Sequence, residues 1–299
     1  MTIRVLQFGT SGQVATELRR QAPAHDLDLL ALSRADADLT DPEACAAAVE
    51  KARPDLVVIA AAYTAVDLAE RERDAAIRVN AESPAAIATA AGQNGAAVVH
   101  FSTDYVFDGT KAGAYVEDDE TRPASVYGDS KLQGERAVWV GTPRSVILRT
   151  SWVVSAHGRN FVKTMLRLAD EGRPIRVVDD QWGRPTSAAD LAGFVLANAG
   201  RLVAAESGDP IFGLTHFANA GETTWRRVAE ATFDLALGAE APNVEPITTA
   251  DYPTPAKRPA RSVLDTQRLE TLFGYTPRPW RTALADIVAD LKGQAQERR

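Results

Sequence analysis

Short apolar runs alternate along the first half of the chain with longer stretches in which apolar residues recur every three or four positions. The apolar runs are rich in β-branched residues and have apolar side chains on both faces, which is typical of strands buried in a parallel sheet. They predict strands at Ile3–Phe8, Leu27–Leu32, Leu56–Ala60, Ala97–Ser102 and Ser145–Ser151. The longer stretches predict helices at Gln13–Gln21, Pro42–Ala52, Asp74–Ala91 and Ser125–Trp139.

This alternation of strand and helix indicates the fold class. Repeated strand–helix units form a parallel sheet with right-handed crossovers and helices on both faces. We therefore predict an α/β fold with a Rossmann-like doubly wound parallel sheet, built mainly from residues 1–151.

The pattern changes after about residue 151, where proline-rich irregular stretches separate the helices. Helices are predicted at Asn160–Glu171, Ala188–Leu202, Thr223–Leu237 and Trp280–Leu291. The densest proline-rich stretch is Tyr252–Pro259, and we expect the tail Gln294–Arg299 to be a frayed helix end. Residues 152–299 are expected to form mainly a smaller C-terminal domain that is interleaved with the sheet.

Composition and charge narrow the class of protein. Hydrophobic residues make up 45% of the 299 positions and charged residues 24%, which is ordinary globular composition and excludes wholesale disorder. The net charge of −7 argues against a nucleic-acid polymer or an anionic membrane as partner. The single cysteine, Cys45, cannot form an intrachain disulfide, and neither a leader-like N-terminus nor a membrane-length apolar stretch is visible. We therefore expect a cytoplasmic protein.

A glycine-rich turn joins the first predicted strand to the first predicted helix. Its residues, spaced G-x-x-G, are Gly9, Thr10, Ser11, Gly12, Gln13 and Val14. Small residues allow a tight turn and close backbone approach, and the free N–H groups of a helix N-terminus bind pyrophosphate. The turn predicts a dinucleotide site, with an ordinary strand-to-helix turn as the alternative.

The residues at the end of the second predicted strand indicate which dinucleotide cofactor is bound. An acidic residue there binds the ribose 2′-hydroxyl of NAD, whereas a cation accommodates the 2′-phosphate of NADP. This chain has Ser33 and Arg34 at that point. We therefore predict NADPH in preference to NADH, with Arg34 pairing with the phosphate through charge-assisted hydrogen bonds. A solvated surface arginine is the alternative.

Three further residues are of types that take part in proton transfer in active sites. Tyr127 and Lys131 are four residues apart at the start of a predicted helix, so their side chains share one helical face. A nearby lysine favours the phenolate and would lower the tyrosine pKa towards the working pH, which suits a proton donor. Thr103 follows an apolar strand, where its hydroxyl is placed to hydrogen-bond a substrate carbonyl oxygen. For the tyrosine and lysine, simple packing of a ring on a lysine stem is the alternative.

With Thr103, Tyr127 and Lys131 in the Ser/Thr–Tyr–Lys positions, the chain resembles the extended short-chain dehydrogenases/reductases. More narrowly, it resembles the family of dTDP-4-dehydrorhamnose reductases, which carry out the last step of dTDP-L-rhamnose synthesis. The matching stretches cover nearly the whole chain, and the last four are the more family-specific. They are Gly9–Val14, Ala60–Asp67, Ser102–Phe107, Val126–Gly134, Arg149–Val153, Asn160–Met165, Asp180–Thr186 and Tyr252–Pro259.

The resemblance implies a reaction in which NADPH delivers hydride to C4 of dTDP-4-dehydro-β-L-rhamnose and dTDP-L-rhamnose is formed. Tyr127 would protonate the developing oxyanion, Lys131 would lower the pKa of Tyr127 and hold the nicotinamide ribose, and Thr103 would hydrogen-bond the reacting oxygen. The first half of the chain would then bind NADPH, and the second half mainly the nucleotide sugar.

Further residues match cofactor or substrate positions of the family. At the cofactor these are Asp38 and Leu39 beside the adenine, and Ala62, Tyr63 and Thr64 after the third strand. At the sugar they are Asp104 and Trp152, although a buried tryptophan is as often part of a core. Candidates for the dTDP pyrophosphate are Arg184, Lys257 and Arg258, each of which could equally be a surface cation.

The resemblance also raises the question of a metal ion. Some relatives form a dimer around Mg²⁺ held by glutamates, and the corresponding positions here are Glu17, Asp190 and Asp290. Two of these side chains are one methylene shorter, and Mg²⁺ demands near-octahedral oxygen geometry. We therefore expect solvated helix carboxylates, with a Mg²⁺ site as the alternative. No transition-metal site is expected, because the histidines are scattered along the chain at His25, His100, His157 and His216.

Two other functions stay open on the sequence. One is a non-catalytic regulatory or binding subunit of the same fold, similar to the β subunit of methionine adenosyltransferase. The other is a different nucleotide-sugar reductase, or an epimerase that would retain its nicotinamide cofactor without net NADPH consumption. The expected partner is a dTDP-sugar, and the expected assembly is a monomer or homodimer.

Overall fold

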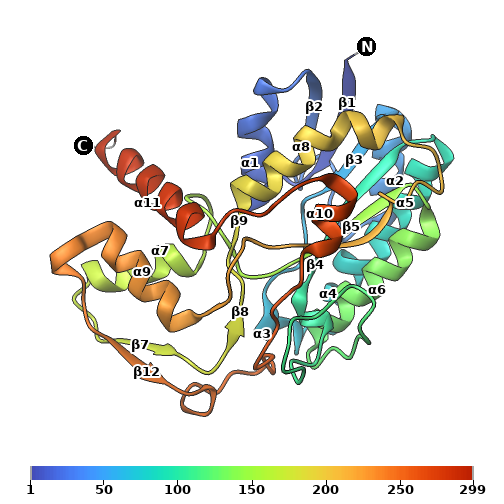
Figure 1. Cartoon of the computed structure of the whole chain (residues 1–299). Helices are drawn as coiled ribbons and strands as arrows, with labels where there is room; N and C mark the ends of the chain where they lie inside the picture. Colours follow the sequence, from blue (N-terminus) through green and yellow to red (C-terminus); the bar gives the residue numbers. More distant parts are fainter. Residues whose placement is uncertain (1, 298–299) are drawn as a thin grey trace.

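A six-stranded parallel sheet forms the centre of the larger lobe of the computed structural model, which describes residues 2–297 (Figure 1). Its strand order is β10-β5-β4-β3-β1-β2, and the neighbouring strands are parallel. The strands are β1 (Ile3–Phe8), β2 (Leu27–Leu32), β3 (Leu56–Ile59), β4 (Ala97–Thr103), β5 (Ser145–Thr150) and β10 (Gly213–Phe217). The predicted doubly wound α/β fold is confirmed. The chain order reverses at β1, between β2 and β3, and open α/β sheets bind ligands at such a switch point.

Alternate side chains of each strand enter different hydrophobic layers. In β1, Val5 belongs to one layer, and Leu6 and Phe8 belong to the other. Helices α1 (Gln13–Gln21) and α8 (Ala188–Ala204) cover the first layer, and α2 (Pro42–Ala52), α5 (Ser83–Gln93) and α6 (Val126–Gly141) cover the second. Because both faces of the sheet are buried, its strands are apolar at successive positions, and this made them visible in the sequence.

The helix predicted over Asp74–Ala91 is interrupted in the structure. It begins as α4 (Arg73–Ile77), passes through a π-helical turn at Arg78–Glu82 and continues as α5. Pro84, in the first turn of α5, has no N–H to donate to the carbonyl of Asn80, so a regular α-helical ladder cannot pass through this point. The predicted helix is therefore present from Arg73 to Gln93, with a π-helical turn inside it. The Asn80 side chain of the π-helical turn is buried.

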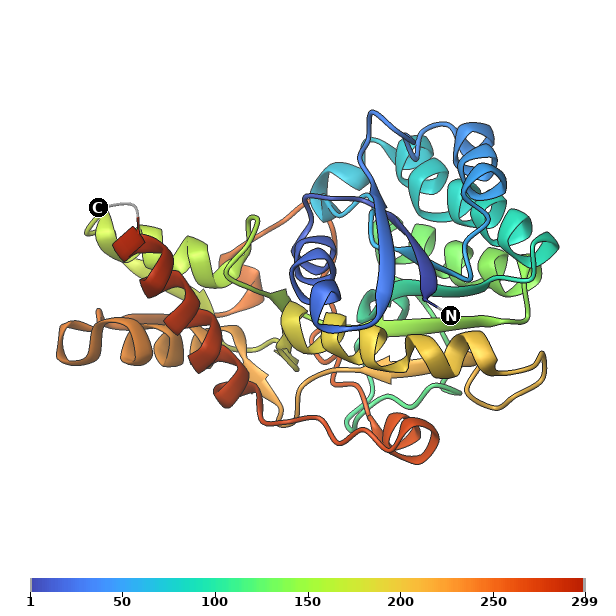
Figure 2. The same ribbon diagram turned by 90° about the horizontal axis from the view of Figure 1, so that it is seen from above.

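The second half of the chain contributes to both lobes, which lie side by side in Figures 1 and 2. The smaller lobe contains α7 (Phe161–Asp170), α9 (Trp225–Leu237), α11 (Trp280–Glu297) and the pair β7 (Ile175–Val178) with β12 (Val244–Ile247). Strand β10, which the sequence pattern did not predict, returns to the sheet and pairs with β5. The remaining short elements are α3 (Val66–Ala69), β6 (Val153–Val154), β8 (Trp182–Gly183), β9 (Thr186–Ser187), β11 (Thr223–Thr224) and α10 (Gln267–Phe273).

Two further expectations concern the C-terminal tail and the absence of a membrane-spanning segment. Of the tail expected to be a frayed helix end, residues 294–297 continue α11, and residues 298 and 299 lie outside the described residues. Within residues 2–297, no helix combines the length and the apolar character needed to cross a membrane.

Candidate active site

The glycine-rich turn after β1 lies at the switch point of the sheet. Gly9 has a φ of +101°, and a Cβ at this position would lie 2.9 Å from the Cβ of Ala61, just beyond β3. Gln7, a polar residue inside the apolar β1, donates to the carbonyls of Gly9 (2.7 Å) and Ala15 (3.0 Å) and so holds the turn. Gly12 precedes α1 and offers no side-chain acceptor to the N–H groups of its first turn. These groups therefore remain available to a pyrophosphate.

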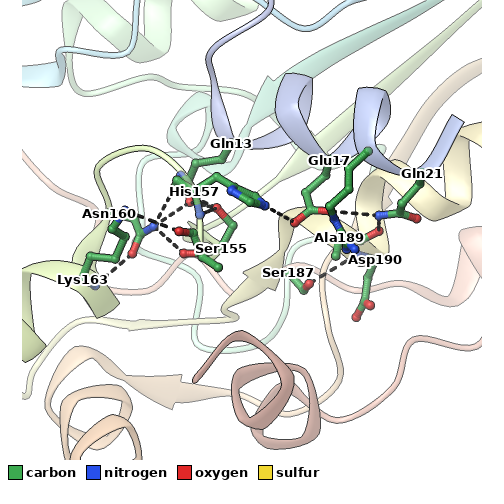
Figure 3. Close-up of polar contacts among 12 residues, drawn as sticks. Gln13, Glu17, Gln21, Ser155, His157, Asn160, Lys163, Ser187, Ala189 and Asp190 are labelled. Carbon is green, nitrogen blue, oxygen red and sulfur yellow. Dashed lines mark hydrogen bonds and ion pairs between the residues drawn. The ribbon is translucent and has the colours of Figure 1, made fainter. Parts of the chain in front are cut away.

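The side chain of Gln13, at the start of α1, is directed towards the second half of the chain (Figure 3). Its Nε2 donates to the Val153 carbonyl (3.0 Å), and its Oε1 accepts from the Ser155 hydroxyl (3.0 Å) and from Asn160 Nδ2 (3.0 Å). Because the amide is engaged, the backbone N–H is the group of Gln13 that is left for a phosphate. The same contacts attach α1 to the loop that leads into α7.

Ser33 and Arg34 follow β2, and two carboxylates accompany them. Ser33 donates to Asp36 through its N–H (2.9 Å) and its hydroxyl (2.6 Å), and these hydrogen bonds lower the pKa of Asp36. The Nε of Arg34 donates to Asp38 (2.8 Å), whose pKa is lowered first by the Thr40 N–H and then by Arg34. Ser33 and Arg34 were predicted to lie at the 2′-phosphate of the cofactor, and of these two Ser33 is already hydrogen-bonded to Asp36. Arg34 has a side chain that is 80% exposed, and its two Nη groups lie outside the bond to Asp38.

The loop of Ala62, Tyr63 and Thr64 follows β3, and its first and last residues are exposed. The backbone of Tyr63 is held by the buried Asn80, whose Oδ1 accepts the N–H (2.8 Å) and whose Nδ2 donates to the carbonyl (3.0 Å). Asn80 also donates to the hydroxyl of Ser130 on α6 (2.9 Å). It therefore connects the predicted cofactor loop to the helix that carries the predicted proton donor. Sequence reasoning missed Asn80, because a polar residue inside a predicted helix does not show what it will contact.

Thr103 and Tyr127 meet where the end of β4 packs against the start of α6. Gly128 permits this close approach, since a Cβ there would lie 2.2 Å from the carbonyl oxygen of Tyr105. The Thr103 hydroxyl acts on the pKa of the Tyr127 phenol, which it lowers. The Tyr127 ring meets the ring of Tyr105 edge to face, with 5.8 Å between centroids. The structure thus brings the predicted hydroxyl and phenol close together.

Lys131 lies one helical turn after Tyr127 and is buried, and its Nζ donates to the Phe101 carbonyl (2.5 Å). Burial raises the pKa of Tyr127 to about 12, although the Thr103 hydroxyl opposes the rise. Burial also lowers the pKa of Lys131 to about 8. The predicted lowering of the Tyr127 pKa by Lys131 is therefore wrong, because desolvation of the phenol dominates. Tyr127 keeps its proton at neutral pH, as a proton donor must.

Asp104 lies next to Thr103 and is only 2% exposed. Its Oδ1 accepts from the Thr103 hydroxyl (3.1 Å), and its Oδ2 accepts from the Ser262 hydroxyl (2.5 Å). Burial raises the pKa of Asp104 to about 7, although both hydrogen bonds oppose the rise. No pattern in the sequence singles out Ser262, which reaches the site from the segment that follows the proline-rich stretch.

A buried ion pair lies beside this group, one helical turn after Lys131. Glu135 on α6 accepts from Arg149 of β5 through both oxygens, at 2.8 and 2.7 Å. The Ser102 hydroxyl of β4 also donates to Glu135 (2.5 Å). The side chains of the ion pair are no more than 4% exposed. The pair therefore fixes α6, which carries Tyr127 and Lys131, to β5 and to β4, which ends at Thr103.

Trp152 follows β5 and has a backbone φ of +49°, in the left-handed region. Its ring stacks on Trp225, the first residue of α9, with 3.8 Å between centroids. The side chain is half-buried. It therefore lies where the end of the sheet meets the smaller lobe, at a position that can line a substrate site.

The three cations predicted for a pyrophosphate have different surroundings. Arg184 donates through Nη1 to the Leu264 carbonyl (2.7 Å) and to a threonine hydroxyl, and it is half-buried. Arg258 makes a bidentate ion pair with Asp67 of α3, with both distances at 2.8 Å. Lys257 is exposed. Both guanidinium groups are thus already engaged with oxygens of the chain itself.

Glu17, Asp190 and Asp290 line one cavity of about 300 Å³ between α1, α8 and α11; Figure 3 shows the first two. Glu17 is buried and accepts from Arg20 (2.8 Å), and Asp190 accepts from Arg278 (2.7 and 2.8 Å). The expectation of solvated carboxylates is therefore wrong for Glu17 and Asp190, because arginines neutralise them, whereas Asp290 is exposed. Within residues 2–297 of the single chain, no group of three or more histidine, cysteine, aspartate or glutamate residues is arranged to hold a metal ion.

A Thr–Tyr–Lys group at the same sheet edge as a glycine-rich turn, on a doubly wound sheet, is typical of oxidoreductases of the short-chain dehydrogenase/reductase class. The family described as RmlD substrate binding domain matches residues 3–292. The chain is 44% identical to a dTDP-4-dehydrorhamnose reductase of Burkholderia thailandensis, over 98% of this chain and 100% of that protein. The chain thus belongs to the dTDP-4-dehydrorhamnose reductase family, and the resemblance inferred from the sequence is confirmed.

Two other proteins are similar over nearly the whole chain. One, from Streptomyces antibioticus, is named a probable dTDP-4,6-dihydroxy-2-methyloxan-3-one 4-ketoreductase; it is 40% identical over 97% of this chain and 96% of that protein. The other is the crystal structure of a dTDP-4-dehydrorhamnose reductase of Bacillus anthracis in complex with NADP. It is 33% identical and superimposes with a TM-score of 0.90 over 97% of this chain and 100% of that chain.

Proposed function

We propose that this chain reduces the 4-keto group of dTDP-4-dehydro-β-L-rhamnose with NADPH and so forms dTDP-L-rhamnose. The family to which the chain belongs supports this substrate. The observation that carries the chemistry is the close packing of the start of α6, with Tyr127, against the end of β4, with Thr103, at the same sheet edge as the glycine-rich turn.

NADPH supplies the hydride when it is bound, and several groups of the chain suit it. The N–H groups at the start of α1 suit its pyrophosphate. A Cβ added at Gly12 would meet only the Ala60 carbonyl oxygen, at 3.8 Å, so the backbone there is open to close approach. The exposed guanidinium of Arg34 suits the 2′-phosphate, and the similar Bacillus anthracis structure contains NADP.

Tyr127 is the proposed proton donor to the oxygen of the former carbonyl. Its raised pKa keeps the phenol protonated until that oxygen gains negative charge, and an alkoxide is a stronger base than a phenolate. Lys131, buried one turn along α6, would stabilise the phenolate that remains and hold the nicotinamide ribose. General acid catalysis of this kind contributes about 10²–10⁴-fold to the rate.

A second candidate is reduction of the 4-keto group of a different dTDP-sugar. The similarity to the Streptomyces antibioticus ketoreductase favours it, because that protein matches nearly the whole chain at 40% identity. A non-catalytic binding subunit and an epimerase on the same scaffold are two further hypotheses, and neither of these would consume NADPH.

The deciding experiment follows NADPH oxidation with dTDP-4-dehydrorhamnose, with other dTDP-4-keto-sugars, and with GDP- and UDP-linked keto-sugars. We expect turnover with dTDP-4-dehydrorhamnose in preference to the rest. Preference for another keto-sugar contradicts the proposed substrate. Binding without turnover supports a regulatory subunit, and product isomerisation without net NADPH consumption supports an epimerase.

A further inference from the structure

The carboxyl of Asp104 is buried without a cation. In the described part of the chain, the side chains that donate to it are two hydroxyls, from Thr103 and Ser262, and no lysine, arginine or histidine pairs with it. The nearby Asp67, by contrast, has a bidentate arginine. Burial without a cation disfavours the ionised form of a carboxyl and favours the protonated form.

Ser262 is placed by the fold and not by local sequence. It is 158 residues away from Asp104 along the chain, and its own N–H donates to the Trp182 carbonyl of β8 (2.8 Å). The residue is 1% exposed, and its hydroxyl donates to Oδ2 of Asp104 at 2.5 Å. This leaves Oδ1 as the carboxyl oxygen that faces Thr103.

The Thr103 hydroxyl has one proton, and this proton goes to Asp104. The Thr103 oxygen accepts the N–H of Tyr105 (3.2 Å), while the hydroxyl proton is directed to Oδ1 of Asp104 (3.1 Å). In this arrangement Thr103 cannot donate to another oxygen. If Asp104 carries a proton on Oδ1, this hydrogen bond reverses, and the Thr103 proton becomes free for the Tyr127 phenol or for a substrate oxygen. Donation from Thr103 favours the phenolate, which agrees with the direction in which Thr103 acts on the pKa of Tyr127.

We propose that Ser262 is a positioning residue for this reaction, which holds the Asp104 carboxyl with Oδ1 against Thr103, so that protonation of Asp104 frees the Thr103 proton to turn towards the Tyr127 phenol and the substrate carbonyl. The inference rests on the proposed reduction. It adds to the Thr–Tyr–Lys group a carboxyl that sets the direction of the hydrogen bonds and a serine that fixes this carboxyl.

The groups around Asp104 are consistent with a carboxyl that gains and loses a proton near neutral pH. Burial raises its pKa to about 7, and the Ser262 hydrogen bond is the first of the influences that lower it. Tyr105 and Tyr127 are the titratable groups that interact with it, and the charges of Arg258 and Asp67 also act on Tyr105. Loss of the Ser262 hydroxyl therefore raises the pKa of Asp104 further.

The test compares the wild type with Ser262→Ala, with Ser262→Thr, which keeps the hydroxyl, and with Ser145→Ala. Ser145 is a matched control, because it is also buried and its hydroxyl has no hydrogen-bond partner among the described residues. Infrared spectra during a pH titration follow the protonated carboxyl of Asp104, assigned by its absence in Asp104→Asn. We expect Ser262→Ala to move this titration up by about one to two pH units, and Ser262→Thr and Ser145→Ala to leave it near the wild-type value.

The kinetic measurement is kcat for NADPH-dependent reduction over the same pH range. Wild-type kcat should fall as the pH rises through the pKa of Asp104, Ser262→Ala should shift this fall upwards, and Asp104→Asn should lack it. An unshifted Asp104 titration in Ser262→Ala overturns the proposal, and so does an equal loss of rate at every pH. If the wild type reduces none of the keto-sugars, the proposed function fails, whereas the infrared titration still decides the role of Ser262.

Discussion

Single side chains decide how much of this site is left for a ligand. The amide of Gln13, the hydroxyl of Ser33 and the guanidinium of Arg258 each make hydrogen bonds within the chain. Tyr127 and Arg34 differ from them, because the phenol holds a transferable proton and Arg34 extends an exposed guanidinium beyond its bond to Asp38. These two residues therefore give the sharpest tests of the proposed chemistry.

Replacement of Tyr127 by phenylalanine removes the proposed proton donor and leaves the ring. We expect kcat to fall by about 10²–10⁴-fold, while the Kd for NADPH measured by fluorescence titration stays close to the wild-type value. Tyr115→Phe is the matched control, since its hydroxyl donates to Asp108 (2.9 Å) and to none of Thr103, Asp104 and Lys131, so its loss should leave kcat unchanged. Full activity of Tyr127→Phe would exclude the phenol as the donor.

Arg34→Ala tests the choice of cofactor. Loss of the guanidinium should raise the KM for NADPH much more than the KM for NADH, because only NADPH carries the 2′-phosphate. The ion pair with Asp38 is exposed, so the stability of the fold should change little. Arg4→Ala, which removes a comparable exposed ion pair with Asp55, should leave both KM values unchanged. Equal effects of Arg34→Ala on the two cofactors would show that Arg34 does not read the phosphate.

At the scale of elements, α6 is the part of the fold on which the site depends. Gly128 lets its first turn approach β4, Asn80 links it to the loop after β3, and Glu135 pairs with Arg149 of β5. Three strand ends and one helix are thereby held in a fixed arrangement. The buried ion pair is the part of this arrangement whose contribution can be measured most directly.

Arg149→Met should destabilise the protein by about 3–5 kcal/mol, because it leaves the buried carboxylate of Glu135 without its cation. Urea denaturation at neutral pH measures this loss. Arg167→Ala, which removes an exposed ion pair with Glu171, should change the free energy of unfolding by less than about 1 kcal/mol. The double variant Glu135→Met with Arg149→Met should recover part of the stability. A loss as small as that of Arg167→Ala would show that the buried charge is compensated in another way.

At the scale of the whole molecule, the return of the chain from the smaller lobe to the sheet places a histidine in the core. His216 lies on β10 and is fully buried, and its Nδ1 is 3.1 Å from the Asp265 carbonyl oxygen. Burial lowers its pKa to about 3, with Arg149 as the next cause. Because the unfolded chain binds a proton on this histidine at a higher pH, the stability of the entire fold depends on pH through it.

The sign of this dependence follows from the lowered pKa. The contribution of the neutral His216 to stability is fully present above the pKa of this histidine in the unfolded chain, about 6.5. It is lost as the pH falls towards the folded pKa of about 3. Between these limits, His216 binds up to one proton more in the unfolded chain than in the folded protein. The free energy of unfolding therefore rises by up to about 1.4 kcal/mol per pH unit. His216→Gln should flatten the plot of unfolding free energy against pH by this amount, while at pH 8 it should alter only packing. An unchanged slope would mean that His216 is not neutral in the folded protein.

Several features could be predicted from the sequence because local spacing determines them. The strands of the sheet interior showed as apolar runs, and the turn from Gly9 to Gly12 showed as glycine spacing between a strand and a helix. Strand β10 did not show, because its short run mixes glycine, threonine and histidine with two apolar residues. Asn80 and Ser262 were missed because their partners are 17 to 158 residues away along the chain.

By itself, the sequence determined the doubly wound sheet, the position of the glycine-rich turn, the Thr–Tyr–Lys group and the family, since each depends on residue types at short spacing. The tertiary structure alone decided which polar atoms are already hydrogen-bonded, which carboxylates are neutralised by arginines, and how far burial shifts the pKa values of Tyr127, Lys131 and Asp104. The physical reason is that hydrogen-bond partners and desolvation are set by groups that folding brings together from distant parts of the chain. A spacing of four residues places a lysine near a tyrosine, but the low-dielectric surroundings decide where the proton resides.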